Sequence, residues 1–223
     1  MEATITKLDL SRFCANDLDE RDYLHTPWRR GQWVYATNGH LAIRVPAAAY
    51  PDVAEVTEKV PNLGAMFDKT MTGRDLEYLL LPPVPKLREC YDCDGKGKVR
   101  AIKCVDCTDG EFVHGEYLYT CKNCERSPGG EGWEHLPDHC EARTNEVLRT
   151  CHTCDGLGFD RRQGCMQLGP AKYSNVYLAM FAALPQVRVC PGTAARDKYD
   201  DERELPAIFT FDGGHGMLMP FRE

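Results

Sequence analysis

Four pairs of cysteines with C-x-x-C spacing constrain the fold of this 223-residue chain more than any other feature of its sequence. Two sulfurs three residues apart can bind one metal ion from a tight turn, and two such turns complete a tetrahedron. Thiolate ligands in a tetrahedron favour zinc. The spacing therefore predicts two zinc ions, each with four cysteine ligands, and leaves open which pairs share an ion. The predicted ligands are the pairs Cys90/Cys93, Cys104/Cys107, Cys121/Cys124 and Cys151/Cys154.

The other common use of twelve cysteines is a disulfide framework, which is typical of short secreted chains. This chain is long, and its start, MEATITKLDLSRF, has neither the basic nor the apolar region of a signal peptide. No stretch approaches the roughly 18 consecutive apolar residues of a membrane-spanning helix. These features favour metal binding in a reducing compartment, so we expect a cytoplasmic protein with no membrane partner.

Glycines follow the first and the fourth cysteine pair at matching positions, as Cys93-Asp94-Gly95-Lys96-Gly97 and Cys154-Asp155-Gly156-Leu157-Gly158. Glycine permits positive φ and lets backbone N–H groups approach the sulfurs, which partly offsets the negative charge of a four-thiolate site. Each pair also follows a short strand-like lead, namely LREC, VRAIKC, YLYTC and VLRTC. Because the segment is polar, we expect metal binding to drive its folding.

Catalytic uses of the paired cysteines are disfavoured by their pattern. A catalytic zinc ion keeps one ligand position open, whereas four cysteines close the site. A thiol oxidoreductase places C-x-x-C at the start of a helix in a βαβ unit, whereas these pairs follow strands. No Ser/His/Asp set, phosphate-binding loop or carboxylate pair indicates hydrolase or transferase chemistry. We therefore expect a protein that is not an enzyme.

The remaining cysteines have weaker interpretations. The HLPDHC segment offers either a further metal site or surface residues, and the sequence does not decide between them; its candidates are His135, His139 and Cys140. The other three, Cys14, Cys165 and Cys190, are expected to be core or surface cysteines.

The distribution of cysteines divides the chain into residues 1–87, 88–166 and 167–223. The middle part holds ten of the twelve cysteines and many glycines. A compositional island between two globular stretches indicates an insertion, with flanks that complete one domain. We expect these flanks to be α+β, with helices packed on antiparallel strands, and the insert to be a small β-rich two-zinc module.

Turn residues locate two hairpins in the flanks. Asn38-Gly39 separates two strand-like runs and predicts a hairpin over residues 34–45, with positive φ at both turn positions and an end at Pro46. A second hairpin is predicted over residues 208–219, around Asp212-Gly213-Gly214, and it follows a strand over residues 186–190.

Apolar spacing and capping residues predict two helices in the flanks. The first covers residues 73–81, with Thr72 as its cap and a stop at Pro82-Pro83. The second covers residues 175–184, with Ser174 as its cap. The charged residues 196–204 predict a surface loop.

Two repeats in the middle part resemble the C-x-x-C-x-G-x-G repeat of the DnaJ-type cysteine-rich domain. Residues 90–97 (CYDCDGKG) and 151–158 (CHTCDGLG) fit it fully, and residues 104–111 (CVDCTDGE) and 121–128 (CKNCERSP) are degenerate copies. The resemblance implies that the first repeat shares a zinc ion with the fourth, and the second with the third. It covers about 65 residues and includes no J-domain or His-Pro-Asp motif, so recruitment of a chaperone ATPase is not implied.

The flanks resemble one domain of a bacterial sliding clamp, the β-type processivity factor of DNA polymerase III. The segment VYATNGH is similar to the strand of that family that ends in A-T-D-G-H, and the last residues, MPFR, are similar to its closing M-P-M-R. The segment YPDV followed by Val60-Pro61 is similar to Y-P-D…V-I-P, and residues 172–184 resemble the helix before its last strands.

The clamp resemblance implies a role in DNA replication and an apolar pocket for partner peptides near the C-terminal strand. A buried strand is the other interpretation of the residues that would form this pocket, Met217, Met219, Pro220 and Phe221. The bacterial chain holds three such domains, and this chain has room for one. Residues 175–184 contain no lysine or arginine, so sliding on DNA is not expected.

Charge argues against a nucleic-acid partner. The formal net charge is -7, so phosphate neutralisation contributes little to binding. The insert has one basic cluster, which either contacts phosphates or balances the negative zinc sites; it comprises Lys96, Lys98, Arg100 and Lys103.

These features predict a non-enzymatic, zinc-stabilised binding protein with a protein partner. The partner would be a replication protein, or a host factor bound by an adaptor or inhibitor from a phage or mobile element. Three alternatives remain: a zinc-dependent chaperone-like module that binds unfolded clients, a nucleic-acid-binding zinc protein, and a thiol enzyme with a reactive cysteine. The sequence leaves the oligomeric state open.

Overall fold

The computed structural model describes residues 7–56, 60–72, 76–122, 124, 127–130, 132–137, 145–192, 194–196, 202–204 and 206–221. The chain forms two compact units. We call Met1–Lys86 with Gly164–Glu223 the flanking unit, and Leu87–Gln163 the insert unit. Among the described residues, no helix has the length and apolar character needed to cross a membrane.

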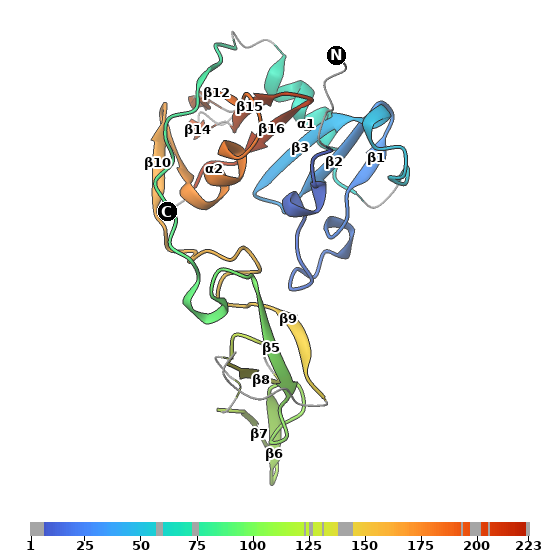
Figure 1. Cartoon of the computed structure of the whole chain (residues 1–223), viewed down its shortest axis with the longest axis vertical. Coiled ribbons are helices and arrows are strands. Elements are labelled where there is room, and N and C mark those ends of the chain that lie inside the picture. The colour runs from blue at the N-terminus through green and yellow to red at the C-terminus, as the bar shows by residue number, and fades with distance from the viewer. Residues whose placement is uncertain are drawn as a thin grey trace. The chain divides into compact units, whose positions relative to one another are not determined.

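A seven-stranded sheet organises the flanking unit, in the order β1-β2-β3-β16-β15-β12-β4 (Figure 1). Its strands are β1 (Trp28–Arg30), β2 (Trp33–Thr37), β3 (Leu41–Pro46), β4 (Leu79–Leu80), β12 (Arg188–Cys190), β15 (Ala207–Phe211) and β16 (Gly214–Leu218). All neighbouring strands are antiparallel. Because β3 from the first chain segment pairs with β16 from the last, the two flanks form one sheet.

The described part of the flanking unit also contains two further strand pairs, two α-helices and three short 3-10 helices, Leu10–Phe13, Asp22–Leu24 and Ala47–Ala49. The pairs are β10 (Cys165–Leu168) with β11 (Ala171–Ser174), and β13 (Ala194–Arg196) with β14 (Glu202–Glu204). The helices are α1 (Leu63–Met71) and α2 (Asn175–Ala182). The presence of both helices and antiparallel strands agrees with the expected α+β class.

The two helices cover opposite faces of the sheet, because successive strand residues point to opposite sides. Val34 and Ala36 of β2 pack in one core cluster with Phe181 of α2. Tyr35, which lies between them, packs in a second cluster with Phe67 of α1. The flanking unit is therefore a three-layer arrangement with an apolar core on each side of the sheet.

Both predicted hairpins are present, but the first turn differs from the prediction. Strands β2 and β3 pair Thr37 with Ala42, and β15 pairs with β16. Gly39 has φ +87°, whereas Asn38 does not have positive φ. The Asn38 Oδ1 atom instead accepts hydrogen bonds from the backbone N–H of His40 (3.0 Å) and of Leu41 (3.1 Å). The asparagine side chain thus replaces one left-handed backbone position.

The helix predicted over residues 73–81 is wrong in its described part. Leu79–Leu80 form strand β4 and pair with Val189 and Arg188 of β12; residues 73–75 lie outside the described residues. The helix lies earlier, as α1, where Asn62 Oδ1 accepts from the N–H of Ala65 at 3.2 Å. Pairing with β12 keeps the two leucines extended, and helical spacing of a few leucines is too weak to overcome it.

Other sequence expectations for the flanks are partly met. Helix α2 begins at the predicted residue, although the side chain of Ser174 makes no capping hydrogen bond. The predicted strand over residues 186–190 is shortened to β12, because Gln186 has φ +52°. The predicted charged loop over residues 196–204 ends in paired strands, β13 and β14, and residues 197–201 lie outside the described residues.

The insert unit has little apolar core of its own. It contains the sheet β8-β5-β9 and a separate hairpin, β6-β7. The strands are β5 (Lys98–Lys103), β6 (Glu111–His114), β7 (Tyr117–Thr120), β8 (Trp133–Leu136) and β9 (Val147–Thr150). Apart from cysteines, the buried hydrophobic residues in its described part are Val99, Ala101 and Leu136. Cysteines therefore occupy most of the interior of this unit.

Acid is expected to destabilise the flanking unit through His215. This side chain lies beside the ring of Trp33 and opposite Arg44 in the sheet. Burial, and then the charge of Arg44, lower the pKa of His215 below its ordinary value. The unfolded chain therefore binds the proton more tightly, so this contribution to stability is complete above about pH 6.5 and is lost as the pH falls below it.

The variant His215→Gln tests this dependence. Thermal melts at about pH 7.5 and pH 5.5 should show a smaller acid-induced drop in melting temperature for the variant than for the natural chain. Any effect of acid on the insert unit is common to both proteins and cancels in the comparison. Equal drops in the two proteins would contradict the prediction.

Candidate metal centres and an apolar pocket

The eight paired cysteines lie in two groups of four within the insert unit. Cluster 1 consists of Cys90, Cys93, Cys151 and Cys154, and cluster 2 of Cys104, Cys107, Cys121 and Cys124. In each cluster all four sulfurs lie within 4.8 Å of one another. No disulfide joins any cysteine in the described part of the chain. The first pair thus lies with the fourth and the second with the third, which is the grouping that the DnaJ resemblance implies.

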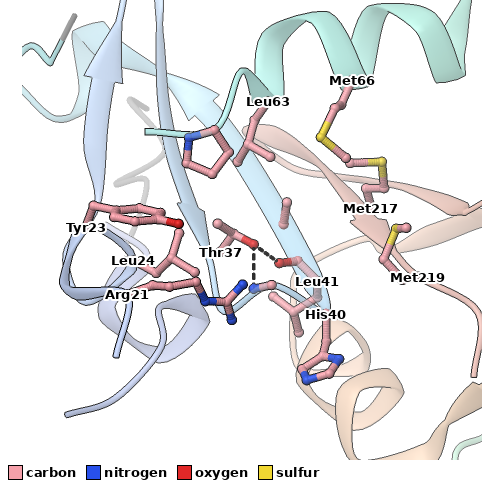
Figure 2. Close-up of a pocket in the computed structure, with 13 residues that line it drawn as sticks. Arg21, Tyr23, Leu24, Thr37, His40, Leu41, Leu63, Met66, Met217 and Met219 are labelled. Atoms are coloured by element: carbon pink, nitrogen blue, oxygen red, sulfur yellow. Dashed lines mark hydrogen bonds between the residues drawn. The ribbon is translucent and has the colours of Figure 1, made fainter. Parts of the chain in front are cut away.

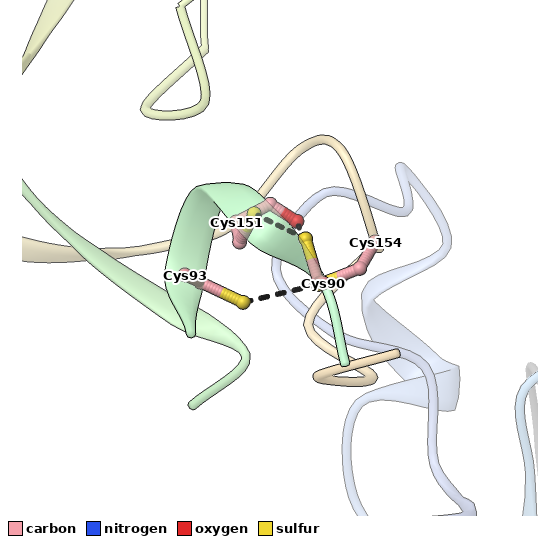
Figure 3. A group of neighbouring side chains, drawn as sticks. All are labelled: Cys90, Cys93, Cys151 and Cys154. Carbon is pink, nitrogen blue, oxygen red and sulfur yellow. Dashed lines mark hydrogen bonds between the residues drawn. The ribbon is translucent and has the colours of Figure 1, made fainter. Parts of the chain in front are cut away.

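The sulfur spacings fit a tetrahedral metal site. Zinc–sulfur bonds of about 2.3 Å place two sulfurs of a tetrahedron about 3.8 Å apart. In cluster 1 the Sγ–Sγ distances are 3.9 Å for Cys90–Cys151 and 3.7 Å for Cys93–Cys154 (Figure 3). In cluster 2 the corresponding distances are 3.9 Å and 3.5 Å. The two clusters could therefore hold two metal ions.

In cluster 1 the two complete repeats form reciprocal backbone hydrogen bonds. The N–H of Cys90 donates to the carbonyl oxygen of Gly158 at 2.9 Å, and the N–H of Cys151 donates to that of Gly97 at 3.0 Å. Within each repeat the second sulfur accepts a backbone hydrogen bond at 3.3 Å, from Gly97 to Cys93 and from Gly158 to Cys154. Each repeat thus makes the same contacts to the other. Backbone amides approach the sulfurs as the glycine positions predict, and such donors favour thiolate.

Cluster 2 is built on the same plan with different spacing. The N–H of Cys104 donates to the carbonyl of Gly132 at 2.8 Å, and that of Cys121 donates to Gly110 at 2.7 Å. The N–H of Gly132 also donates to the sulfur of Cys124 at 3.3 Å. Gly132 lies eight residues after Cys124, whereas Gly97 lies four after Cys93. The repeat pattern could not identify Gly132 because its spacing differs.

The clusters are electrostatically suited to a cation. Burial raises the pKa of Cys93 and that of Cys104 to about 11. Burial likewise raises the pKa of Cys154 above its ordinary value. Several buried thiolates without a counter-ion would be costly, so without a metal these groups are neutral thiols at pH 7. A soft divalent cation stabilises the thiolates, and its binding releases protons.

Of the other predicted metal ligands, His135 belongs to no possible metal-binding group in the described part of the chain. His135 lies in β8 opposite Ala101, and His139 and Cys140 lie outside the described residues. Burial raises the pKa of Cys14 to about 12, which is unlike a reactive thiol. Cys165 is half-buried, and Cys190 is buried in the flanking core.

The basic cluster of the insert is partly neutralised. The guanidinium of Arg100 donates two hydrogen bonds to the carboxylate of Glu146, at 2.6 Å and 2.7 Å. Both side chains are about four-fifths buried. Arg100 is therefore held by a carboxylate, which weakens the case that the cluster contacts phosphates.

An apolar pocket of about 210 Å³ opens on the flanking unit (Figure 2). Met66 of α1 and the C-terminal residues Met217 and Met219 contribute thioether side chains to it. Pro220 and Phe221, which sequence analysis placed with them, do not line it. The remaining lining residues are Arg21, Tyr23, Leu24, Thr37, Gly39, His40, Leu41, Ala42, Pro61 and Leu63.

Sequence reasoning anticipated two pocket residues and missed most of the others. Met217 and Met219 were identified through the clamp resemblance. Residues 21–24 and helix α1 enter the pocket from distant parts of the chain, and no local pattern marks them. These residues come together at the pocket only in the folded structure.

No family model, curated protein or solved structure matches this chain.

Proposed function

We propose that this chain is a non-enzymatic binding protein whose insert unit folds around two structural zinc ions and whose flanking unit binds an apolar segment of a partner protein. The observation that carries the zinc assignment is the ligand chemistry: each cluster presents four sulfurs at tetrahedral spacing. Four thiolates favour zinc and leave no ligand position open for substrate or water. The ions would therefore stabilise structure and not perform catalysis.

The apolar pocket supports a protein partner for the flanking unit. Its lining includes Thr37, Gly39 and His40 from the ATNGH segment, Pro61 from the Val60-Pro61 segment, and Met219 from the MPFR segment. These are the segments that resemble a sliding clamp, a family in which a pocket near the C-terminal strand receives partner peptides. The pocket thus brings together residues from three separate clamp-like segments.

The size and polarity of the pocket indicate what could occupy it. A volume of about 210 Å³ lies below the roughly 300–1,000 Å³ that is usual for small-molecule sites, and it suits one or two apolar side chains. The Thr37 hydroxyl donates to the Leu41 carbonyl oxygen and accepts from the Gly39 N–H at 3.0 Å. Methionines adapt to irregular apolar shapes. A short peptide segment anchored by leucine or phenylalanine fits this environment.

The expected partner is a replication protein, or a host factor bound by an adaptor or inhibitor from a phage or mobile element. The clamp-like segments support the replication setting, and the net charge of -7 disfavours direct binding to DNA.

Native mass spectrometry of the reduced full chain tests both halves of the proposal. With the peptide Ser-Ser-Leu-Phe-Ser-Ser we expect two zinc ions and one peptide per chain, and no adduct with an all-serine hexapeptide. The variant Met66→Gln/Met219→Gln should retain zinc and lose at least tenfold in peptide affinity, because both half-exposed methionines line the pocket.

The matched control is Phe221→Gln, which changes an exposed apolar residue that lies outside the pocket lining. It should bind the peptide like the natural chain. Equal binding of both peptides, or equal losses in the two variants, would contradict the pocket assignment, and a metal-free folded protein would contradict the zinc assignment.

A further inference from the structure

The β6-β7 hairpin of the insert unit carries four aromatic side chains on one face. Phe112 pairs with Tyr119, and His114 pairs with Tyr117. Residues directly opposite each other, and residues two apart along a strand, share a face. The rings of Phe112 and Tyr119 stack at 5.7 Å, and those of Tyr117 and Tyr119 meet edge to face at 6.5 Å. We call these four residues the aromatic face.

The aromatic face is exposed. Tyr117 is 69% exposed, Tyr119 45% and Phe112 40%. Within the described residues, β6 and β7 form a two-stranded sheet with no third strand, and every residue of both strands is exposed. Exposed aromatic side chains that touch one another on an uncovered hairpin are typical of an interaction surface.

The hairpin is anchored at its base between the second and third cysteine pairs. Thr108 and Glu111 exchange backbone hydrogen bonds at 2.8 Å and 3.0 Å, and the N–H of Cys121 donates to Gly110 at 2.7 Å. A two-stranded hairpin alone is only marginally stable in water. The cysteine turns at its base therefore stabilise the hairpin, so that the aromatic face is already formed in the unbound protein.

The negative charge around the hairpin favours a cationic partner. Residues 104–124 contain four acidic residues, including Glu111 and Glu116, and one basic residue, Lys122. The faces of aromatic rings carry negative potential and attract arginine and lysine. The same negative charge repels phosphate groups and disfavours pairing with a second copy of this hairpin.

We propose that the aromatic face binds arginine or lysine side chains of a basic segment in a partner protein. The cationic groups lie over the tyrosine rings, and the nearby carboxylate of Glu116 contributes charge attraction. This surface is in the insert unit and does not depend on the pocket of the flanking unit.

Fluorescence anisotropy with the full-length, metal-loaded protein tests the proposal. The probe is a fluorescein-labelled octapeptide, (Arg-Leu)4, and the neutral comparison is (Gln-Leu)4. Because Tyr117→Leu/Tyr119→Leu keeps charge and apolar character but removes two ring faces, Kd for (Arg-Leu)4 should rise about fivefold to thirtyfold. Glu116→Gln should raise Kd by a smaller factor.

The matched control is Tyr91→Leu, which removes a 92%-exposed tyrosine of the same unit outside the hairpin. It should leave Kd unchanged. This result would distinguish binding at the aromatic face from general electrostatic attraction between the acidic protein and the basic peptide. Native mass spectrometry of each variant checks that the metal content, and hence the hairpin base, is intact. In the natural chain, ring currents should also shift the arginine Hδ signals of the bound peptide upfield.

Several outcomes would overturn the proposal. Equal affinity for (Gln-Leu)4 would indicate general binding of apolar clients. If oligo-dT displaced the peptide and bound the aromatic face in its place, this surface would be a nucleic-acid site. If the natural chain formed a dimer and Tyr117→Leu/Tyr119→Leu abolished it, the aromatic face would bind a second copy of this chain. Absence of the arginine ring-current shift would overturn the proposal even if the double variant proved unstable.

Discussion

Cys151→Ser is expected to reduce the zinc content from two ions per chain to one and to unfold the region around cluster 1. Serine removes a buried sulfur atom that lies 3.9 Å from the sulfur of Cys90, and a hydroxyl is a poor substitute ligand. Structural zinc contributes roughly 10–16 kcal/mol to the folding of small domains. The described part of the insert has few other buried apolar residues, so we expect a loss of more than about 5 kcal/mol in its free energy of unfolding.

Native mass spectrometry gives the metal count, and urea unfolding followed by circular dichroism gives the stability. Cys165→Ser is the matched control, because Cys165 is half-buried in β10 and belongs to neither cluster. It should retain two zinc ions. A Cys151→Ser protein that keeps both ions and its full stability would contradict the assignment of cluster 1.

The local part of the two cysteine clusters was predictable from sequence, whereas the grouping of the cysteine pairs was not. A C-x-x-C turn brings two sulfurs together within four residues, so spacing alone indicates half a site. Which halves combine depends on contacts between separated parts of the chain: partner cysteines are 61 positions apart in cluster 1 and 17 apart in cluster 2. Only the family resemblance suggested that grouping.

The failures of sequence reasoning have the same origin. Leu79–Leu80 is a strand because it pairs with β12. Strand β12 lies about a hundred residues later in the chain, so the local sequence around Leu79 does not indicate this pairing. The pocket collects side chains from four separated segments, and the aromatic face depends on the register that places Phe112 opposite Tyr119. Turns are more predictable because their determinants are local, and Gly39 has the positive φ expected of it.

Gly97→Ala is expected to disrupt cluster 1 far more than Gly115→Ala disrupts the hairpin. Both glycines have positive φ, +71° and +66°. A left-handed backbone costs a residue with a Cβ about 1–2 kcal/mol, and this cost applies to both variants. The two sites differ in their surroundings. A Cβ at position 97 would lie 2.2 Å from the carbonyl oxygen of Gly156, whereas one at position 115 meets no atom within 4 Å.

The obstacle at Gly97 is backbone of the other repeat, which cannot move without displacing the turn that carries Cys151 and Cys154. We therefore expect Gly97→Ala to cost more than about 3 kcal/mol and to weaken zinc binding at cluster 1, and Gly115→Ala to cost about 1 kcal/mol. Gly158→Ala should behave like Gly97→Ala, because its Cβ would lie 2.3 Å from the Gly95 carbonyl oxygen.

Urea unfolding and zinc competition with a chromophoric chelator measure the two effects. If all three variants lost the same stability, the cost would come from positive φ alone, and the two repeats could not be in contact as the structure has them. A selective loss at Gly97 and Gly158 would show that the close approach of the two repeats, as well as the sulfur ligands, determines the affinity of cluster 1 for its metal.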